Sequence, residues 1–223
     1  LGLDGRVPRI HRGPRLLAIS VLAGVGLLAG GAAAAQGATI TLNAAPAAAG
    51  AADCSTPANA CTIDTAVTNA NAANVADSVV IVLADGTYAL SPGVPAALAV
   101  TFTGPSLSLV AASGASPTLD GAGATRILNT VVGSNVTVDG ITFKNGLTNG
   151  LGGAIQNAGT ATVKNATFTA NSGANGGAIS TAAGGTLAVA DSSFTANTAT
   201  AVGGGAFISF GSTTVDRSAV LDN

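Results

Sequence analysis

The chain has 223 residues, enough for one large or two small domains, and 48% of them are hydrophobic, mostly Ala, Val, Leu and Ile. Only 8% are charged and Glu is absent, whereas an average soluble domain has roughly 25% charged residues. The polar surface must therefore come from Thr, Ser, Asn and Gly. These residues favour strands and turns, so the composition argues against a helical fold.

The first 35 residues have the pattern of a secretory signal peptide. Their basic stretch contains Arg6, Arg9, Arg12 and Arg15. It is followed by the apolar run LLAISVLAGVGLLAGG and by four alanines, the last three of which form the small-residue end. This order predicts cleavage before Gln36. A retained membrane anchor is the alternative, but the most apolar part, 16–28, is shorter than the roughly 20 residues that a membrane span needs. We expect a secreted or cell-surface chain with no span in its mature part.

Removal of residues 1–35 changes the charge and the available chemistry. It leaves four basic residues and nine aspartates, a net charge of −5, and takes away the only histidine, His11. An acidic chain is a poor partner for nucleic acid or anionic membrane. No imidazole remains for catalysis or metal binding.

Two cysteines, Cys54 and Cys61, lie in the stretch CSTPANAC. In an exported chain a disulfide between them is expected, and Pro57 suits a tight closed turn. Two cysteines without histidine do not make a zinc site, so neither a metal nor another cofactor is expected.

A short helix is predicted directly after Cys61. Thr62 is a suitable N-cap residue. Helical spacing is kept by Ile63, Ala66, Val67, Ala70 and Ala73. We assign residues 36–78 to an N-terminal cap region that contains the disulfide and this helix.

From residue 79 onward, short apolar runs alternate with turn residues, as in SVVIVLADGTYAL, SLSLVAAS and NVTVDGITFKNG. Strands of about 4 to 6 residues separated by Gly, Asn, Asp and Pro fit several all-β folds. A repeat from residue 138 onward narrows the choice. Its aligned columns are Val138, Val163, Val189 and Val215; Phe143, Phe168, Phe194 and Val220; Asn145, Asn171, Asn197 and Asn223; and the pairs Gly152-Gly153, Gly176-Gly177 and Gly204-Gly205.

A period near 25 residues made of short strands predicts that each repeat forms one coil of a parallel β-helix. We expect this β-helix to cover residues 79–223. Like positions then stack about 4.8 Å apart, so Val and Phe form buried ladders. Glycine permits positive φ or close backbone approach at corners, and Asn tolerates the left-handed conformation. The linkers of four to six residues before the glycine pairs are expected where the chain leaves the core.

These motifs carry a family resemblance. The alternation of GGAI with Phe-x-x-Asn, here 176–179 and 194–197, resembles the polymorphic outer membrane protein repeats of bacterial surface proteins, over roughly 139–223. The resemblance implies a right-handed, pectate-lyase-like parallel β-helix. The first copy departs because Phe143-Lys144-Asn145 is one residue shorter, and the last has Val220 in place of Phe.

A second resemblance lies upstream. The stretch CTIDTAVTNAN is similar to the Cys-Ser-Leu-Arg-Glu-Ala-Ile signature that precedes β-helices in many exported bacterial proteins. Cys61 and Ala66 match, whereas Asp64 and Thr65 replace the Arg and Glu of the signature. This similarity implies that the helix caps the open end of the coil.

The resemblance implies an exported bacterial surface protein with a structural or adhesive, non-catalytic role. The alternative is a carbohydrate-active enzyme on the same fold, a polysaccharide lyase or a glycoside hydrolase, which would need clustered carboxylates. Three opposite-charge pairs are candidates, and we interpret them as surface pairs rather than catalytic groups. They are Asp120 with Arg126, Asp139 with Lys164, and Asp191 with Arg217.

The partners expected of such a chain are host or environmental glycans or proteins. The sequence stops on the Asn column at Asn223, without a capping helix. Two readings remain open, a fragment of a longer protein or an end covered by a partner. An uncapped coil exposes a strand edge, which favours self-association there.

Overall fold

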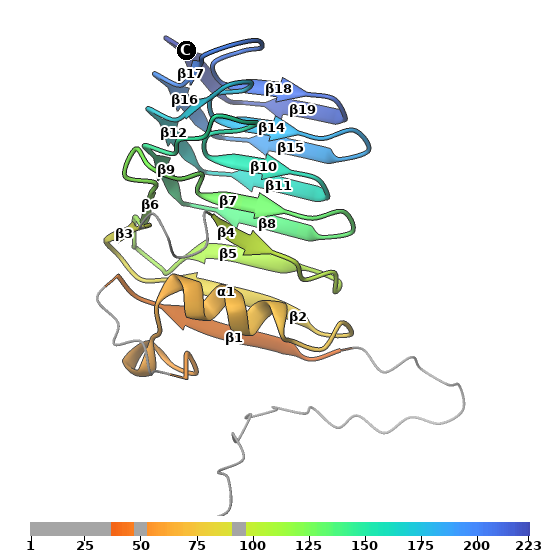
Figure 1. Cartoon of the computed structure of the whole chain (residues 1–223). Helices are drawn as coiled ribbons and strands as arrows, with labels where there is room; N and C mark the ends of the chain where they lie inside the picture. Colours follow the sequence, from red (N-terminus) through yellow and green to blue (C-terminus); the bar gives the residue numbers. More distant parts are fainter. Residues whose placement is uncertain (1–36, 47–52, 91–96) are drawn as a thin grey trace, which may run out of the picture. The chain divides into compact units, whose positions relative to one another are not determined.

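The computed structural model describes residues 37–46, 53–90 and 97–223. All of them belong to the second of two compact units, Ala35–Asn223. The predicted signal peptide, residues 1–35, lies outside the described residues. Within the second unit the chain winds into a parallel β-solenoid of about five turns (Figure 1). The predicted all-β parallel β-helix is confirmed.

Each complete coil contributes one strand to each of three sheets, and every ladder is parallel. The first sheet contains, in spatial order, β1 (Thr39–Ala44), β2 (Ser78–Leu83), β5 (Leu107–Ala111), β8 (Asn135–Asp139), β11 (Thr160–Lys164), β15 (Thr186–Ala190) and β19 (Ser212–Asp216). The second contains β3 (Thr87–Ala89), β6 (Thr118–Asp120), β9 (Thr142–Lys144), β12 (Thr167–Thr169), β16 (Ser193–Thr195) and β20 (Ala219–Leu221). The third contains β4 (Leu98–Val100), β7 (Leu128–Thr130), β10 (Ile155–Asn157), β14 (Ile179–Thr181) and β18 (Phe207–Ser209). A fourth, small ladder joins β13 (Ser172–Gly173) to β17 (Thr198–Ala199).

Helix α1 (Ile63–Asn71) packs against β1, β2 and β4. Thr62 is its N-cap, with its hydroxyl accepting from the Thr65 N–H, and the apolar spacing read from the sequence becomes the buried face. At its last residue, the Asn71 amide bonds the backbone beside β4. Its Nδ2 donates to the Ala99 carbonyl (2.7 Å) and its Oδ1 accepts from the Thr101 N–H (2.9 Å). Helix α1 therefore satisfies the edge of the third sheet at the N-terminal end.

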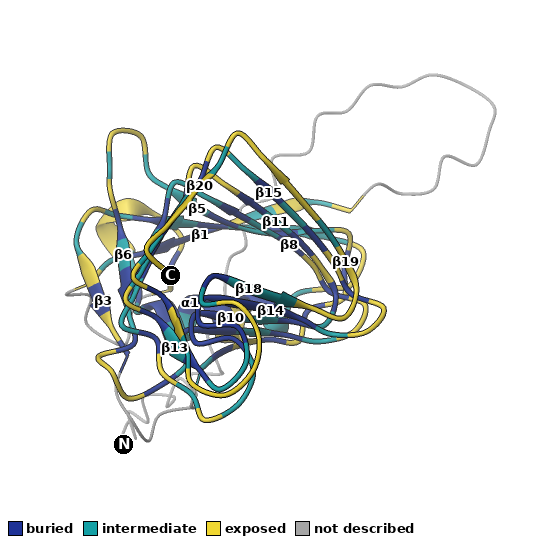
Figure 2. Cartoon of the chain, turned by 90° about the horizontal axis from the view of Figure 1, so that it is seen from above, coloured by how far each residue is buried: buried dark blue, intermediate teal, exposed yellow. Residues whose placement is uncertain are grey.

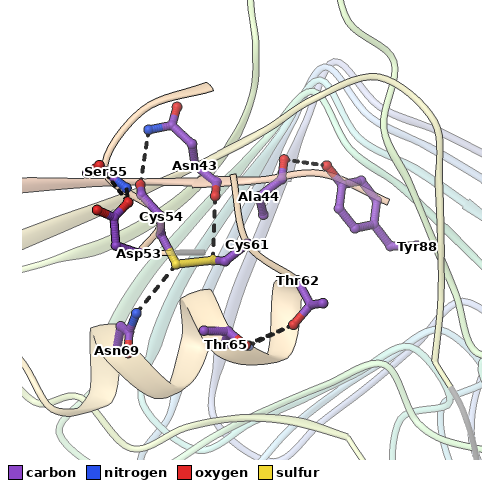
Figure 3. The surroundings of a disulfide bond; sticks show 10 residues. All are labelled: Asn43, Ala44, Asp53, Cys54, Ser55, Cys61, Thr62, Thr65, Asn69 and Tyr88. Carbon is purple, nitrogen blue, oxygen red and sulfur yellow. Dashed lines mark hydrogen bonds between the residues drawn. A yellow bond between two sulfur atoms is a disulfide. The ribbon is translucent and has the colours of Figure 1, made fainter. Parts of the chain in front are cut away.

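Cys54 and Cys61 are joined by a disulfide beside β1 (Figure 3). The loop between them contains the 3-10 turn η1 (Pro57–Asn59). Asn43 in β1 donates its N–H to the Cys54 carbonyl (2.8 Å) and accepts from the Cys61 N–H (2.9 Å). The loop thus holds the outer edge of β1, and Asn69 of α1 reaches the Cys54 sulfur.

Tyr88 in β3 ties the same end together. Its buried hydroxyl donates to the carbonyl of Ala44 (2.8 Å; Figure 3). It also lies within hydrogen-bond distance of the carbonyl of Ala84 (3.0 Å). Burial, the larger cause, and the charge of Asp85 raise the pKa of Tyr88 to about 12.

The buried residues lie in continuous columns along the strands of successive coils (Figure 2). Val138, Val163, Val189 and Val215 pair in register across the first sheet. In the second sheet, the rings of Phe143, Phe168 and Phe194 stack almost parallel, with centroids 4.9 and 4.6 Å apart. The ring of Phe207 from the third sheet then lies tilted over Phe194. Flat stacking of like residues on adjacent rungs gives the core its regularity.

The repeated glycines allow a positive φ at one position of the repeat and close approach of the backbone at another. Gly152 and Gly176 have positive φ, +64° and +71°, while in the next coil Gly203 rather than Gly204 adopts this conformation. The second glycine of each pair permits close approach of neighbouring coils. A Cβ at Gly153 would overlap the Gly177 carbonyl, and one at Gly177 would overlap the Gly205 carbonyl.

Asn171, Asn197 and Asn223 form a hydrogen-bonded ladder at the corner after the second sheet. Each Oδ1 of Asn197 and Asn223 accepts from both the backbone N–H and the Nδ2 of the asparagine one coil earlier, at 2.7–3.1 Å. Asn145 does not join this ladder. The register places Gly146 opposite Asn171, and the Gly146 N–H donates to Asn171 Oδ1 (2.8 Å). Asn145 instead turns the corner with a φ of +53°.

Candidate functional site: the outer face of the first sheet

Two columns of mostly small, polar side chains run across the outside of the first sheet. Burial alternates along its strands, so the residues between the inward-facing ones point outward. The register aligns the first column as Thr39, Ser78, Ser106, Asn135, Thr160, Thr186 and Ser212, with Ser106 directly before β5. It aligns the second as Thr41, Val80, Ser108, Thr137, Thr162, Ala188 and Thr214. We call these fourteen positions the hydroxyl face.

The hydroxyl face carries no charged residue among its fourteen positions. Eleven of them are Thr or Ser. None of these eleven side chains makes a hydrogen bond to another group of the protein, so all eleven hydroxyls are free to bond solvent or a ligand. The charges of this sheet lie in a separate column at the strand ends, at Asp139, Lys164 and Asp216.

Two corners of the solenoid, at the end of β8 and at the end of β6, use the same arrangement of an aspartate, a lysine and an asparagine. Asp139 contacts Lys164 Nζ (3.2 Å) and accepts from Asn165 Nδ2 (2.8 Å). Asp120 likewise contacts Lys144 Nζ (3.3 Å) and accepts from Asn145 Nδ2 (3.0 Å). Burial acts to raise the pKa of Asp120, but hydrogen bonds from the Ala122 N–H, Asn145 and Lys144 outweigh it and lower the pKa.

The third pair joins the last described coil to the coil before it. Arg217 makes two bonds to the carboxylate of Asp191, at 2.7 and 2.9 Å, and also bonds Asp216. The hydrogen bond from Arg217 lowers the pKa of Asp191. The interpretation of Asp139 with Lys164 and of Asp191 with Arg217 as pairs on adjacent coils agrees with these contacts. Exposed pairs of this kind contribute little to stability, because solvent screens them.

The suggested pairing of Asp120 with Arg126 is wrong. Arg126 points to the linker of the next coil, where it donates to the carbonyls of Leu151 (2.8 Å) and Gly152 (3.0 Å) and to the Thr148 hydroxyl. Burial lowers the pKa of Arg126. Its role is to hold that linker against the solenoid, and the sequence gives no local signal for partners some 25 residues away.

The linkers also line a depression of about 340 Å³ at the corner after the second sheet. Its walls are Ala122, Gly123, Asn145, Gly146, Leu147, Ala170 and Ser172. None of these seven residues is ionisable. Within 37–46, 53–90 and 97–223, no group of three or more His, Cys, Asp or Glu side chains could hold a metal ion. The same ranges contain no helix long and apolar enough to cross a membrane.

The last described coil exposes apolar side chains that are buried in earlier coils. Val215 is 46% exposed and Val220 is 47% exposed, whereas Val189 and Phe194, one coil earlier, are 2% and 1% exposed. Leu221 is exposed beside them. These residues form an apolar edge next to the unpaired side of β19 and β20.

Comparison with known proteins finds no matching family model, no matching curated protein and no matching solved structure. The fold therefore stands on the register and the ladders described above. The likeness to polymorphic outer membrane protein repeats rests on the sequence motifs alone.

Proposed function

We propose that the chain is an exported bacterial surface protein with a structural or adhesive role rather than a catalytic one. The hydroxyl face carries this proposal. An adhesive role predicts an extended polar surface without converging charge, and the hydroxyl face spans all seven strands of the first sheet without one charged residue. The corner carboxylates Asp120, Asp139 and Asp191 are each paired with a basic residue on the next coil.

Three features support export. The order of residues in 1–35 is that of a signal peptide. A disulfide between Cys54 and Cys61 suits an oxidising compartment. The GGAI and Phe-x-x-Asn motifs resemble repeats of bacterial surface proteins. We include in the proposal that the β-helix of this chain is right-handed and pectate-lyase-like, as that resemblance implies. The partners would be host or environmental glycans or proteins.

Display on the cell surface is tested by adding protease to intact cells that produce the full chain, with an epitope tag placed in an exposed loop of the solenoid. Loss of the tag signal, while a cytoplasmic marker stays intact, supports surface display. Protection of the tag until the cells are lysed contradicts it.

The catalytic alternative is tested on the purified chain. A panel of pectin-type polysaccharides is incubated with the protein, and chain cleavage is followed by new reducing ends and unsaturated products. Depolymerisation that is abolished by an Asp120→Asn or Asp139→Asn variant would overturn the non-catalytic role.

Self-association through the apolar edge is part of the proposal. Val215, Val220 and Leu221 lie beside unpaired strand groups, and such an edge pairs readily with another chain. Light scattering of the purified protein should show a concentration-dependent dimer or larger species. A monomer at all concentrations would contradict this.

A further inference from the structure

We propose that the hydroxyl face binds ice, so that its partner is a crystal lattice of water. This inference rests on the proposed function because it takes from it the binding role of the hydroxyl face. It goes further by naming ice as the partner. Four properties of the face lead to it: its spacing, its free hydroxyls, its stiffness and its lack of charge.

The spacing is that of a regular two-dimensional array. Neighbouring strands lie about 4.8 Å apart, and outward-facing residues along one strand lie about 6.6 Å apart. The register from β1 to β19 is one-to-one, without a bulge that would break the columns. Side-chain ladders keep such a sheet flatter than an ordinary twisted sheet. In flat planes of hexagonal ice the oxygen atoms also repeat in two directions, at spacings comparable to these two distances on the protein.

The chemistry of the side chains suits a water lattice. The eleven hydroxyls have no partner within the protein, and each hydroxyl can both donate to and accept from water. Thr predominates at the centre of the face, at Thr137, Thr160, Thr162 and Thr186. Because Thr is β-branched, its side chain is restricted about χ1, and little conformational entropy is lost when it is fixed against a lattice.

The lack of charge favours a neutral partner over an ionic one. Binding of an acidic or basic partner normally uses complementary charge, which these fourteen positions do not provide. A polysaccharide is the main neutral rival. Stable seating of sugar rings usually involves exposed aromatic rings, but the face has none, the chain has no Trp, and its single tyrosine, Tyr88, is buried.

The second sheet provides a matched control surface. Its strands are three residues long, and its outward column that contains Thr169 and Thr195 also contains the charged residues Asp120 and Lys144. A Thr on this sheet has the same fold context as one on the hydroxyl face. It does not belong to an uninterrupted neutral array.

The experiment measures inhibition of ice recrystallisation and thermal hysteresis with the purified, secreted chain. Thr162→Lys places a charge at the centre of the hydroxyl face, between Thr137 and Ala188 of the neighbouring strands. Activity should fall at least about tenfold, because the ammonium group would lose water without gaining a partner. Thr169→Lys is the control and should retain activity. Ala188→Thr, which adds a hydroxyl to the second column, should increase it. Circular dichroism verifies that each variant is folded.

The inference would be overturned if the wild-type chain had no effect on ice growth. It would also be overturned if Thr162→Lys and Thr169→Lys lost equal activity on ice. The third contradicting outcome is full activity of Thr162→Lys together with no gain in activity for Ala188→Thr. A parallel pull-down with insoluble cellulose and chitin separates this failure from that of the proposed function. Binding to a polysaccharide that Thr162→Lys abolishes, with no effect on ice, would reject ice and keep an adhesive face. If the wild-type chain neither affects ice nor binds cellulose or chitin, ice is rejected and the hydroxyl face no longer supports an adhesive role.

Discussion

The two ends of the solenoid carry the same inward pattern of apolar residues but differ in what covers them. At the N-terminal end, Val79 and Ile81 of β2 are completely buried beneath β1 and α1. In the last described coil, Val215 and Val220 are nearly half exposed although they continue the same columns. The exposed fraction of an inward-facing side chain in this fold therefore depends on whether a neighbouring coil or cap covers it, and not on the residue type.

The covered end is also held by polar contacts. The disulfide loop bonds the edge of β1, Asn71 bonds the backbone beside β4, and Tyr88 bridges two carbonyls. The contacts that Asn223 makes in the last coil are instead with its own coil and the one before it. This difference predicts unequal responses to equivalent substitutions.

The largest difference is expected in the phenylalanine column. Phe168→Ala removes a buried ring stacked on both sides and should lower the free energy of unfolding by about 3–5 kcal/mol. Val220→Ala, in the same column but half exposed, should cost less than about 1 kcal/mol. Denaturant unfolding of both variants measures this. Equal losses would show that the position of a coil does not govern its contribution.

The disulfide should have the next largest effect. Replacing Cys54 and Cys61 by Ser opens a loop with a sequence separation of seven and should cost about 2–3 kcal/mol from loop entropy. Because the loop contacts β1 and α1, amide exchange should rise there and remain slow in β11 and β15. A uniform rise along the chain would contradict a local role at the covered end.

The asparagine ladder allows a comparison within one column. Asn197→Ala removes an amide that is buried between two coils, which should cost about 1–3 kcal/mol because its partners Asn171 and Phe168 lose hydrogen bonds. Asn223→Ala, in the exposed coil, should cost less than about 1 kcal/mol. The midpoints of thermal unfolding, measured side by side, test this ordering.

Tyr88 gives a test of the covered end by pH alone. Its pKa is raised to about 12 from an ordinary value of 10.0, so the folded state favours the neutral phenol. The resulting stabilisation is complete below pH 10 and is lost as the pH rises from 10 toward 12. Tyrosinate absorbance reports on Tyr88 without interference, since the chain has one tyrosine. Ionisation near pH 10 in the folded protein would show that this end is open, and Tyr88→Phe should remove the alkaline loss.

The sequence predicted the coil because its repeated columns record direct contact between like residues. The phenylalanine and valine positions pair in register, and the helical spacing from Ile63 to Ala70 became the buried face of α1. Periodicity reveals these features because a residue in a β-helix meets its own counterpart one coil away.

The polar contacts between unlike residues could not be predicted in the same way. Asn145 keeps the spacing of 26 residues, but a one-residue difference in the corner puts Gly146 in the ladder position, and glycine has no side chain to reveal it. Arg126 bonds carbonyls of a linker whose length varies between coils. The hydroxyl face was also missed as a surface, because its columns become visible only when the register of all seven strands is known.

Amide hydrogen exchange resolved along the chain, at a low and a high protein concentration, tests the contrast between the two ends most directly. In dilute protein, exchange should be slow from β2 through β15 and in α1, and fast in β19 and β20. Exchange in β19 and β20 should slow at high concentration, where the apolar edge becomes covered. Slow exchange of β19 and β20 in dilute protein, or fast exchange of β1 and α1, would contradict the account.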